Sequence, residues 1–577
     1  MERRTLLSTL VSSFLSESPE RPADTPDNPY ANKTLPNVRR TAAGLEPYTG
    51  PWTVDEVLHL LRRTTFGPSP DHVASLAPLS LSQALDQLFA AQPVEVSQPL
   101  IVDARDLAPI GQTWVNLPYK SSDPTVTFNP IGIRTNSLKA WWTGLMLNQT
   151  LSLREKMTLF WHNHFVTEVS TVADPRYSYY YLALLRANAL GNFKSLTRQV
   201  SVDGAMLRYL NGNTNTKASP NENYGRELQE LFTIGKGPEV ALSDYTYYTE
   251  QDVQAAAHVL TGWKDIQNAD KSVGPVTSTF VAANHDPADK QFSARYGNTV
   301  IQGGATAADG PRELDALIDM IFSQDETAKF FSRQLYRWFV YYVIDDAAET
   351  NVIAPLAAIL RGNNYDVAPA LRTLLGSAHF FDPVNRGCTI KSPLDHLVGL
   401  CRQGQVAFPS DTVKLYTMWT YLWNVAAAMD MNPGDPPNVA GWPAYYQTPE
   451  FNELWVNTDT LPKRSNLSTL LATKGYSTAG AVIAIDPIAL VQTVSNPTDP
   501  NVVINEWAQH LFAVPLTDNQ KAFLKEVLIP GLPDYEWAAE WTTYLADPTN
   551  ATKKAAVKSK LQAMLSFMMS MPEYQLE

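Results

Sequence analysis

Two histidines separated by a single residue are the first candidates for chemistry in this sequence. His162 and His164 lie at the end of an apolar segment, 153–165, beside Trp161 and Phe165. Imidazoles combined with carboxylates bind Zn, Fe or Mn, so the pair predicts part of a site for one divalent transition metal. In a continuous helix His164 joins the apolar face, whereas His162 lies about 200° from it. Both can bind one metal only if the helix ends or bulges there; the alternative is one core histidine and one hydrogen-bonding surface histidine.

The segment 220–234 supplies carboxylates for such a site. On a helical wheel Glu227 falls inside the apolar stripe, and Glu230 falls just beyond its edge. A buried, ionised carboxylate is unfavourable alone, so Glu227 needs a metal, a cation, hydrogen bonds or a raised pKa. We therefore predict Glu227 as a metal ligand, and Glu227 and Glu230 as catalytic carboxylates. The alternative is a structural ion pair between Glu227 and an arginine of another helix, such as Arg62, Arg154 or Arg333.

A further ligand is predicted in loop sequence, where His285 precedes Asp286. Two polar groups that point inward from separate helices are unfavourable unless they meet each other or a shared partner. The segments 153–165 and 220–234 are therefore predicted to pack together. That packing would bring Glu227 and a histidine of the pair within reach of one site.

Other polar side chains nearby are predicted to be helix caps. Ser219 and Glu222 have the spacing of a capping box, and so do Thr249 and Asp252. Ser392 stands directly before a proline at the start of an apolar helical pattern, which makes it a candidate N-cap rather than a nucleophile. The sequence contains no G-x-S-x-G, H-E-x-x-H, P-loop or G-x-G-x-x-G motif, so common serine hydrolases, zincins, nucleotide hydrolases and Rossmann dehydrogenases are poorly supported.

The elements that must position these residues are mainly helices. Apolar residues recur at helical spacing in 136–148, 153–165, 176–190, 220–234, 250–261, 312–343, 366–376, 393–403, 413–428, 504–512, 518–526 and 552–571. Between 272 and 305, alternating Val, Thr and Phe with glycine punctuation indicate a β-hairpin or irregular lobe. We predict an all-α, large multi-helix assembly with this lobe as a minor β component.

The N-terminus carries a candidate export signal, because Arg3-Arg4 precedes a leucine-rich stretch as in twin-arginine signals. The alternative is a short amphipathic or frayed helix. We predict three regions: an export signal and Pro-rich linker over 1–50, a main helical domain over 51–475, and a C-terminal helical segment over 476–577 packed on it. A working signal implies the periplasm or cell envelope; otherwise the protein is cytoplasmic.

The composition argues against some classes of binding partner. The net charge is −13 and no run of Lys and Arg forms a basic stripe, which argues against nucleic acid and anionic membranes as partners. No stretch approaches the ~18 apolar residues of a transmembrane helix. Cys388 and Cys401 are either one disulfide or two free thiols, and neither belongs to a C-x-x-C zinc motif.

Several segments resemble the domain of unknown function 1800 family of bacterial proteins. They are His59–Arg63 with Phe66-Gly67, Leu153–Lys156 leading into Trp161–Phe165, Pro220–Thr233, Tyr248–Val253 leading to Leu260–Trp263, His285-Asp286, Lys391–Pro393 and Pro436–Pro443. Two positions depart from the family pattern: Gly225 replaces the usual alanine, and His258 replaces the arginine before L-T-G-W.

The resemblance implies no activity. Family members are often exported and are often encoded beside a second uncharacterised family that resembles sulfatases, which implies an envelope setting and a sulfatase-like protein partner. Two hypotheses follow. The first is a metal-dependent enzyme of the cell envelope that uses His162, His164, Glu227 and His285 as ligands. The alternative is a structural or partner-binding protein in which the same groups form a buried network that fixes helix packing.

Overall fold

The computed structural model describes residues 29–30, 33, 43–91, 97–121, 123, 125, 127–241, 244–266, 271 and 273–577. Helix makes up 56% of it, and the strands form only short two-stranded antiparallel sheets, which confirms the predicted fold class. The predicted export signal and most of the linker lie outside the described residues. In the part that is described we find no helix with the length and apolar character needed to cross a membrane.

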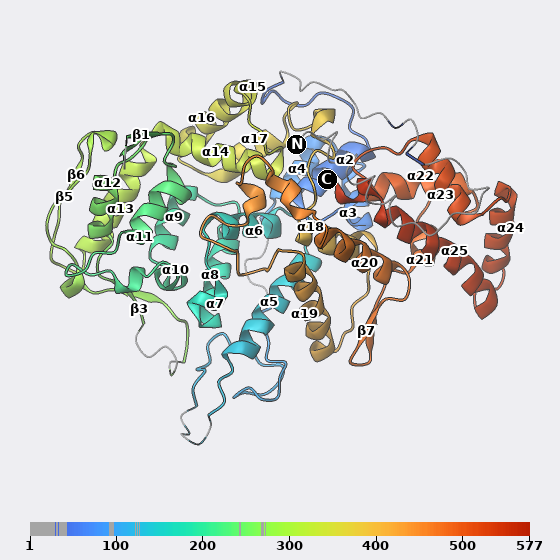
Figure 1. The fold of residues 1–577 in the computed structure, drawn as a ribbon, viewed down its shortest axis with the longest axis horizontal. Helices are drawn as coiled ribbons and strands as arrows, with labels where there is room; N and C mark the ends of the chain where they lie inside the picture. Colours follow the sequence, from blue (N-terminus) through green and yellow to red (C-terminus); the bar gives the residue numbers. More distant parts are fainter. Residues whose placement is uncertain are drawn as a thin grey trace.

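The first half of the chain forms the centre of the molecule and begins the lobe at one end (Figure 1). Its helices are α2 (Val54–Thr64), α3 (Pro70–Leu76), α4 (Leu81–Phe89), α5 (Ile131–Leu147), α6 (Arg154–His164), α7 (Val169–Val172), α8 (Pro175–Ala187), α9 (Phe193–Ser201), α10 (Gly204–Tyr209), α11 (Glu222–Glu227), the π-helix η2 (Leu228–Thr233) and α12 (Glu250–Val259). Helix α6 is central, because nearly all of its side chains are buried.

The β structure gathers mainly in the end lobe with α12 and α13 (Asp309–Phe322). The pairs are β1 (Glu239–Ala241) with β2 (Asp244–Tyr245), β3 (Trp263–Asp265) with β4 (Ser278–Phe280), β5 (Lys290–Gln291) with β6 (Val300–Ile301), and β7 (Tyr476–Thr478) with β8 (Ala481–Ile483). One hairpin, β5–β6, lies wholly within the predicted lobe over 272–305, whereas β4 of that lobe pairs with a strand that precedes it.

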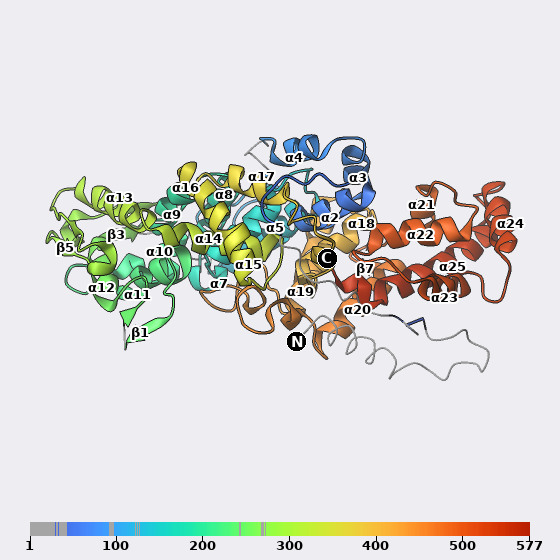
Figure 2. The same cartoon turned by 90° about the horizontal axis from the view of Figure 1, so that it is seen from above.

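The second half returns across the centre and ends in a helical lobe opposite the first (Figure 2). Its helices are α14 (Asp325–Phe339), α15 (Asp346–Ala348), the π-helix η6 (Glu349–Ile353), α16 (Ala354–Gly362), α17 (Val367–Leu375), α18 (Pro393–Gln403), α19 (Thr412–Ala428), α20 (Thr460–Ala472), α21 (Pro487–Gln492), α22 (Pro500–Leu511), α23 (Asp518–Leu528), α24 (Asp534–Leu545) and α25 (Ala551–Ser570). Short 3₁₀ helices are η1 (Gly212–Thr214), η4 (Ala282–Asn284), η5 (Ala294–Tyr296), η7 (Pro383–Asn385), η8 (Pro443–Tyr445), η9 (Phe451–Trp455) and η10 (Pro572–Gln575).

The last residues of the chain return from the C-terminal lobe to the centre. Leu576 forms a β-bridge with Ile390, and the buried Lys391 ammonium donates to the Tyr574 carbonyl over 2.7 Å. The division at 475/476 stays a prediction. Neither Cys388 nor Cys401 forms a disulfide bond.

A close backbone contact joins the first helix to this centre. Gly67, just after α2, has a φ of 79°, and a Cβ there would lie 2.7 Å from the Cα of Gly399 on α18. No side chain fits that distance, so the Phe66-Gly67 motif is explained by packing.

Candidate functional site

A half-open cavity of about 150 Å³ lies between α6, η2, α14 and the segment 440–446. Its lining residues are Phe160, Asn163 and His164 from α6, Glu230 and Leu231 from η2, Phe330, Gln334, Arg337 and Trp338 from α14, and Ala440, Tyr445 and Tyr446. The cavity therefore brings together two of the predicted site residues, His164 and Glu230.

The segment 440–446 contacts α6 through residues of the Pro436–Pro443 motif. The backbone N–H of Trp442 donates to Asn163 Oδ1 over 3.0 Å. Gly441 adopts a φ of 92°, and a Cβ there would lie 2.4 Å from the same oxygen. The glycine of the Pro436–Pro443 motif thus allows the chain to approach α6 closely and close one wall of the cavity.

The glutamate helix differs from the predicted one at both ends. It begins at Asn221, whose side chain accepts from the Asn223 N–H, whereas Ser219 forms a β-bridge with Thr216. The assignment of Ser219 as the N-cap is therefore wrong, and Glu222 pairs with Arg226 over 3.5 Å instead of closing a capping box. The Thr249–Asp252 capping box and the Ser392 N-cap are both present as predicted.

A π-helix replaces the second half of that helix. The N–H groups of Ile234 and Gly235 both reach back to the Gln229 carbonyl, over 3.2 and 2.8 Å. Such a wide turn rotates the residues that follow it relative to those that precede it, and π-segments are frequent at functional sites. The helical wheel is still correct for Leu228, Phe232 and Ile234, which are all buried. Glu230, at the edge of the apolar stripe, lines the cavity, whereas Glu227 does not.

His164 joins the two predicted helices. Its Nε2 lies 2.9 Å from the Phe232 carbonyl oxygen, and Phe165 packs against the Phe232 ring at 5.4 Å, so the predicted packing of 153–165 on 220–234 is confirmed. Because a carbonyl only accepts, Nε2 carries the hydrogen and Nδ1 keeps its lone pair. Burial lowers the pKa of His164 to about 4, so this imidazole is neutral at pH 7.

His162 has different surroundings. It is buried beside the rings of Trp142, at 5.1 Å, and Trp442, at 6.2 Å, and does not line the cavity. Burial lowers the pKa of His162 to about 4, with a smaller opposing effect from Asp435. The alternative of a surface histidine is wrong, because the side chains of both His162 and His164 are buried, with 1% and 8% exposed.

Glu227 is half-buried and makes no hydrogen bond or ion pair with the described residues. Burial, together with the charge of Glu230, raises the pKa of Glu227 to about 7, while Arg226 opposes the shift. Arg226 itself pairs with Glu250 over 2.6 Å, and Arg333 pairs with Glu349 over 2.6 Å. The raised pKa is one of the four outcomes that the sequence left open for Glu227, and its role as a metal ligand stays a prediction.

Glu230 is held in place from two sides. The Tyr248 hydroxyl donates to one carboxylate oxygen over 2.9 Å, and the Lys236 ammonium lies 3.3 Å from the other. Its carboxylate thus stands at the cavity with its charge balanced.

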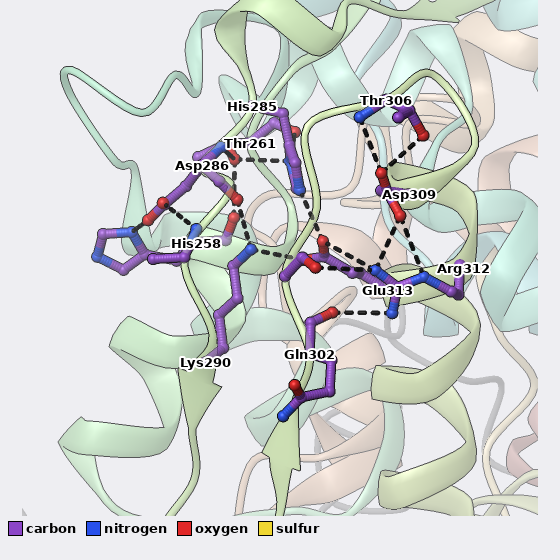
Figure 3. A network of polar contacts seen from close by, with 12 residues as sticks. His258, Thr261, His285, Asp286, Lys290, Gln302, Thr306, Asp309, Arg312 and Glu313 are labelled. Atoms are coloured by element: carbon purple, nitrogen blue, oxygen red, sulfur yellow. Dashed lines mark hydrogen bonds and ion pairs between the residues drawn. The ribbon is translucent and has the colours of Figure 1, made fainter.

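His285 lies in a separate network in the end lobe (Figure 3). Its Nδ1 is 2.9 Å from the Thr261 carbonyl, and its Nε2 is 3.2 Å from a carboxylate oxygen of Glu313. The buried Lys290 ammonium lies 2.5 Å from the other oxygen of Glu313. Nearby, His258 contacts Asp286 over 2.5 Å.

The structure does not bring all the predicted metal ligands together. Among the described residues no group of three or more His, Cys, Asp and Glu side chains is placed to hold a metal ion. The lining of the cavity includes His164 and Glu230 but not His162, Glu227 or His285. The metal site stays a prediction.

Sequence reasoning missed the α14 side of the cavity. Gln334, Arg337 and Trp338 come from a helix with an ordinary amphipathic pattern, in which Arg337 follows Arg333 by one turn. No sequence signal marks Arg337, because Arg333 on the same helix also lacks an acidic residue three or four positions away and is nevertheless paired with Glu326 and Glu349.

With this geometry established, comparison with known proteins places the chain in a family. The family model described as "Protein of unknown function (DUF1800)" matches residues 59–576. The protein belongs to that family. Searches of curated proteins and of solved structures gave no match.

Proposed function

We propose that this is a binding protein, whose ligand or partner inserts a ring-sized group into the cavity between α6, η2, α14 and segment 440–446. The observation that carries the proposal is the lining: five aromatic side chains combined with a few polar groups. Ligand sites in proteins are concave, mostly apolar and lined by few, well-placed polar groups. A volume of about 150 Å³ is close to that of engineered cavities that bind benzene.

The test fills the cavity by enlarging Ala440, the small side chain in its lining. Ala440→Phe places a ring at a lining position, whereas Ala358→Phe places the same ring at an exposed position of α16 as a matched control. Phenol is the probe, measured by saturation-transfer NMR and by titration calorimetry. We expect binding to the wild type and to Ala358→Phe, and loss in Ala440→Phe. The proposal fails if phenol does not bind the wild type, or if it binds Ala440→Phe equally well.

The metal-dependent enzyme is the second candidate, favoured by one specific observation. His164 keeps a free Nδ1 lone pair and lines the same cavity as the Glu230 carboxylate. Glu227, one turn before Glu230 but outside the lining of the cavity, has a pKa of about 7, which lies in the range of a general acid or base at neutral pH. A bound Zn, Fe or Mn would polarise a substrate or activate water.

Metal analysis separates the two candidates. The enzyme hypothesis expects close to one equivalent of metal in protein purified without chelator, and a loss of that metal in Glu230→Gln. Metal at background in the wild type, with phenol binding intact, leaves only the binding protein. The envelope location and a sulfatase-like protein partner remain proposals that rest on the family resemblance.

A further inference from the structure

Arg337 is a largely enclosed cation without a counter-ion. It makes no hydrogen bond or ion pair with the described residues, and its buried Nε has no partner. Its neighbours are the Phe451 ring, 5.8 Å from the guanidinium carbon, and the charges of Arg333 and Glu349. Buried charges are normally paired because losing hydration is unfavourable, so an unpaired arginine requires an explanation.

The nearby carboxylates are already engaged. Glu349 is bound by Arg333 over 2.6 and 3.0 Å. Glu230 contacts Tyr248 and Lys236. Glu577 lies 3.5 Å from Arg63, and Asp395 contacts Lys156. The surrounding protein therefore leaves the guanidinium without an anion of its own.

Arg337 stands where two cavities meet. The larger is the cavity described above, and a smaller one of about 30 Å³ shares Arg337, Trp338 and Tyr445 with it. The rings of Trp338 and Tyr445 stack at 4.4 Å and form the common wall. A ligand in the larger cavity is thus bounded by flat aromatic surfaces and reaches the guanidinium.

The unused polar groups of this wall include several donors. Besides the guanidinium, the buried Trp338 Nε1 has no partner. The Gln334 amide, which offers both donors and an acceptor, lines the same cavity. Asn163 uses its Oδ1 for Trp442 and retains its NH₂ group. A surface rich in free donors matches a ligand rich in acceptors, and the planar guanidinium fork matches a carboxylate.

We infer that the cavity binds a carboxylate carried by a ring-sized group, with the carboxylate on Arg337 and the ring against Trp338 and Tyr445. This inference rests on the proposed function and adds the class of ligand. The carboxylate has two sources in nature, a uronic-acid sugar or the C-terminus of a peptide that ends in an aromatic residue. Both present the same chemistry to Arg337.

The first experiment compares charged and neutral rings on the full-length protein. Calorimetric titrations use benzoate against benzyl alcohol, glucuronate against glucose, and N-acetylphenylalanine against its amide. Because hydrogen bonds between charged groups are the stronger ones, we expect the preferred carboxylate to bind about ten-fold more tightly than its neutral partner. Glucuronate or N-acetylphenylalanine, whichever shows the larger gain, identifies the source. Inorganic phosphate that binds as tightly as the best carboxylate would overturn the ligand class.

Substitutions test whether Arg337 is the residue that binds the carboxylate. Arg337→Met removes the charge and keeps much of the volume, and Arg337→Lys keeps the charge but loses the fork. The matched control is Arg361→Met, which removes an exposed arginine paired with Asp325 on another helix. We expect the carboxylate preference to vanish in Arg337→Met, to shrink in Arg337→Lys and to persist in Arg361→Met.

The outcomes separate the two proposals. If phenol and benzyl alcohol bind but carboxylates gain nothing, or if Arg337→Met keeps the preference, the inference about the ligand is wrong and the binding protein stands. If no ring compound binds the wild type, both fail. Circular dichroism melting checks folding, and Arg337→Met should melt no lower than the wild type, because it removes a partly buried charge that has no counter-ion among the described residues.

Discussion

Replacing Glu227 with glutamine should stabilise the protein at high pH and change little at low pH. The folded-state pKa of Glu227 is about 7, against an ordinary value of 4.5, because the carboxyl group is half-buried near Glu230. A raised pKa means that the folded state binds the proton more tightly than the unfolded state. The stability contributed by the protonated form is therefore fully present below pH 4.5 and is lost as the pH rises through about 7. A glutamine side chain cannot ionise, so the variant escapes this loss.

The magnitude follows from the same shift. At 1.36 kcal/mol for each pKa unit, a fully buried group would lose roughly 3 kcal/mol across this window. Glu227 keeps partial access to solvent, and screening reduces the expected gain of Glu227→Gln to about 1 kcal/mol at pH 8.5.

Urea unfolding of both proteins at pH 5.0 and 8.5 measures the difference directly. Glu222→Gln, on the exposed side of the same helix, is the matched control and should show no such pH-dependent gain. A Glu227→Gln variant that is less stable than the wild type at pH 8.5 would refute the reasoning, since it would show that the ionised carboxylate has a stabilising partner.

Three further predictions concern other parts of the chain. Asn221→Ala should lower the free energy of unfolding by about 1 kcal/mol through loss of the N-cap, and Ser219→Ala by much less, both measured by urea unfolding. Glu313→Gln should lower it by roughly 3 kcal/mol or more, because Lys290 is then buried without its anion; a loss near zero would contradict this assignment. Replacing Arg3 and Arg4 with lysine should retain the protein in the cytoplasm if the export signal works, and unchanged cell fractionation would remove that argument.

The sequence predicted the class of fold and one important contact, but not the composition of the site. Helical periodicity sufficed for an all-α assembly, and inward-facing polar groups predicted correctly that the His164 helix packs on the glutamate helix. The helical wheel correctly placed the Glu227 carboxyl group where burial makes its ionised form unfavourable. It did not predict the π-helix, which has no signature in apolar spacing, or the cavity that Glu230 lines.

Tertiary burial explains the other errors. A helical wheel assigns one face of a helix to solvent, whereas nearly all side chains of α6 are buried, so His162 is buried as well as His164. His285 was grouped with the H-x-H by residue type alone. The structure instead places it with Glu313 and Lys290 in the end lobe, a neighbourhood that depends on how β5 and α13 pack.

The contrast between paired and unpaired charges supports the choice of site. Other buried arginines are satisfied by the protein, either by an anion, as Arg134 is by Asp106 over 2.7 Å, or by backbone carbonyls, as Arg62 is by those of Gln509 and His510 over 3.0 and 3.1 Å. Arg337, in contrast, makes no hydrogen bond or ion pair with the described residues. Structural networks also shift pKa values, so a perturbed group alone does not mark a site. Here the unpaired cation lines a cavity that also has aromatic walls and unpartnered donors. In a ring-sized ligand that carries a carboxylate, the carboxylate would bind the guanidinium and the donors, and the ring would contact the aromatic walls.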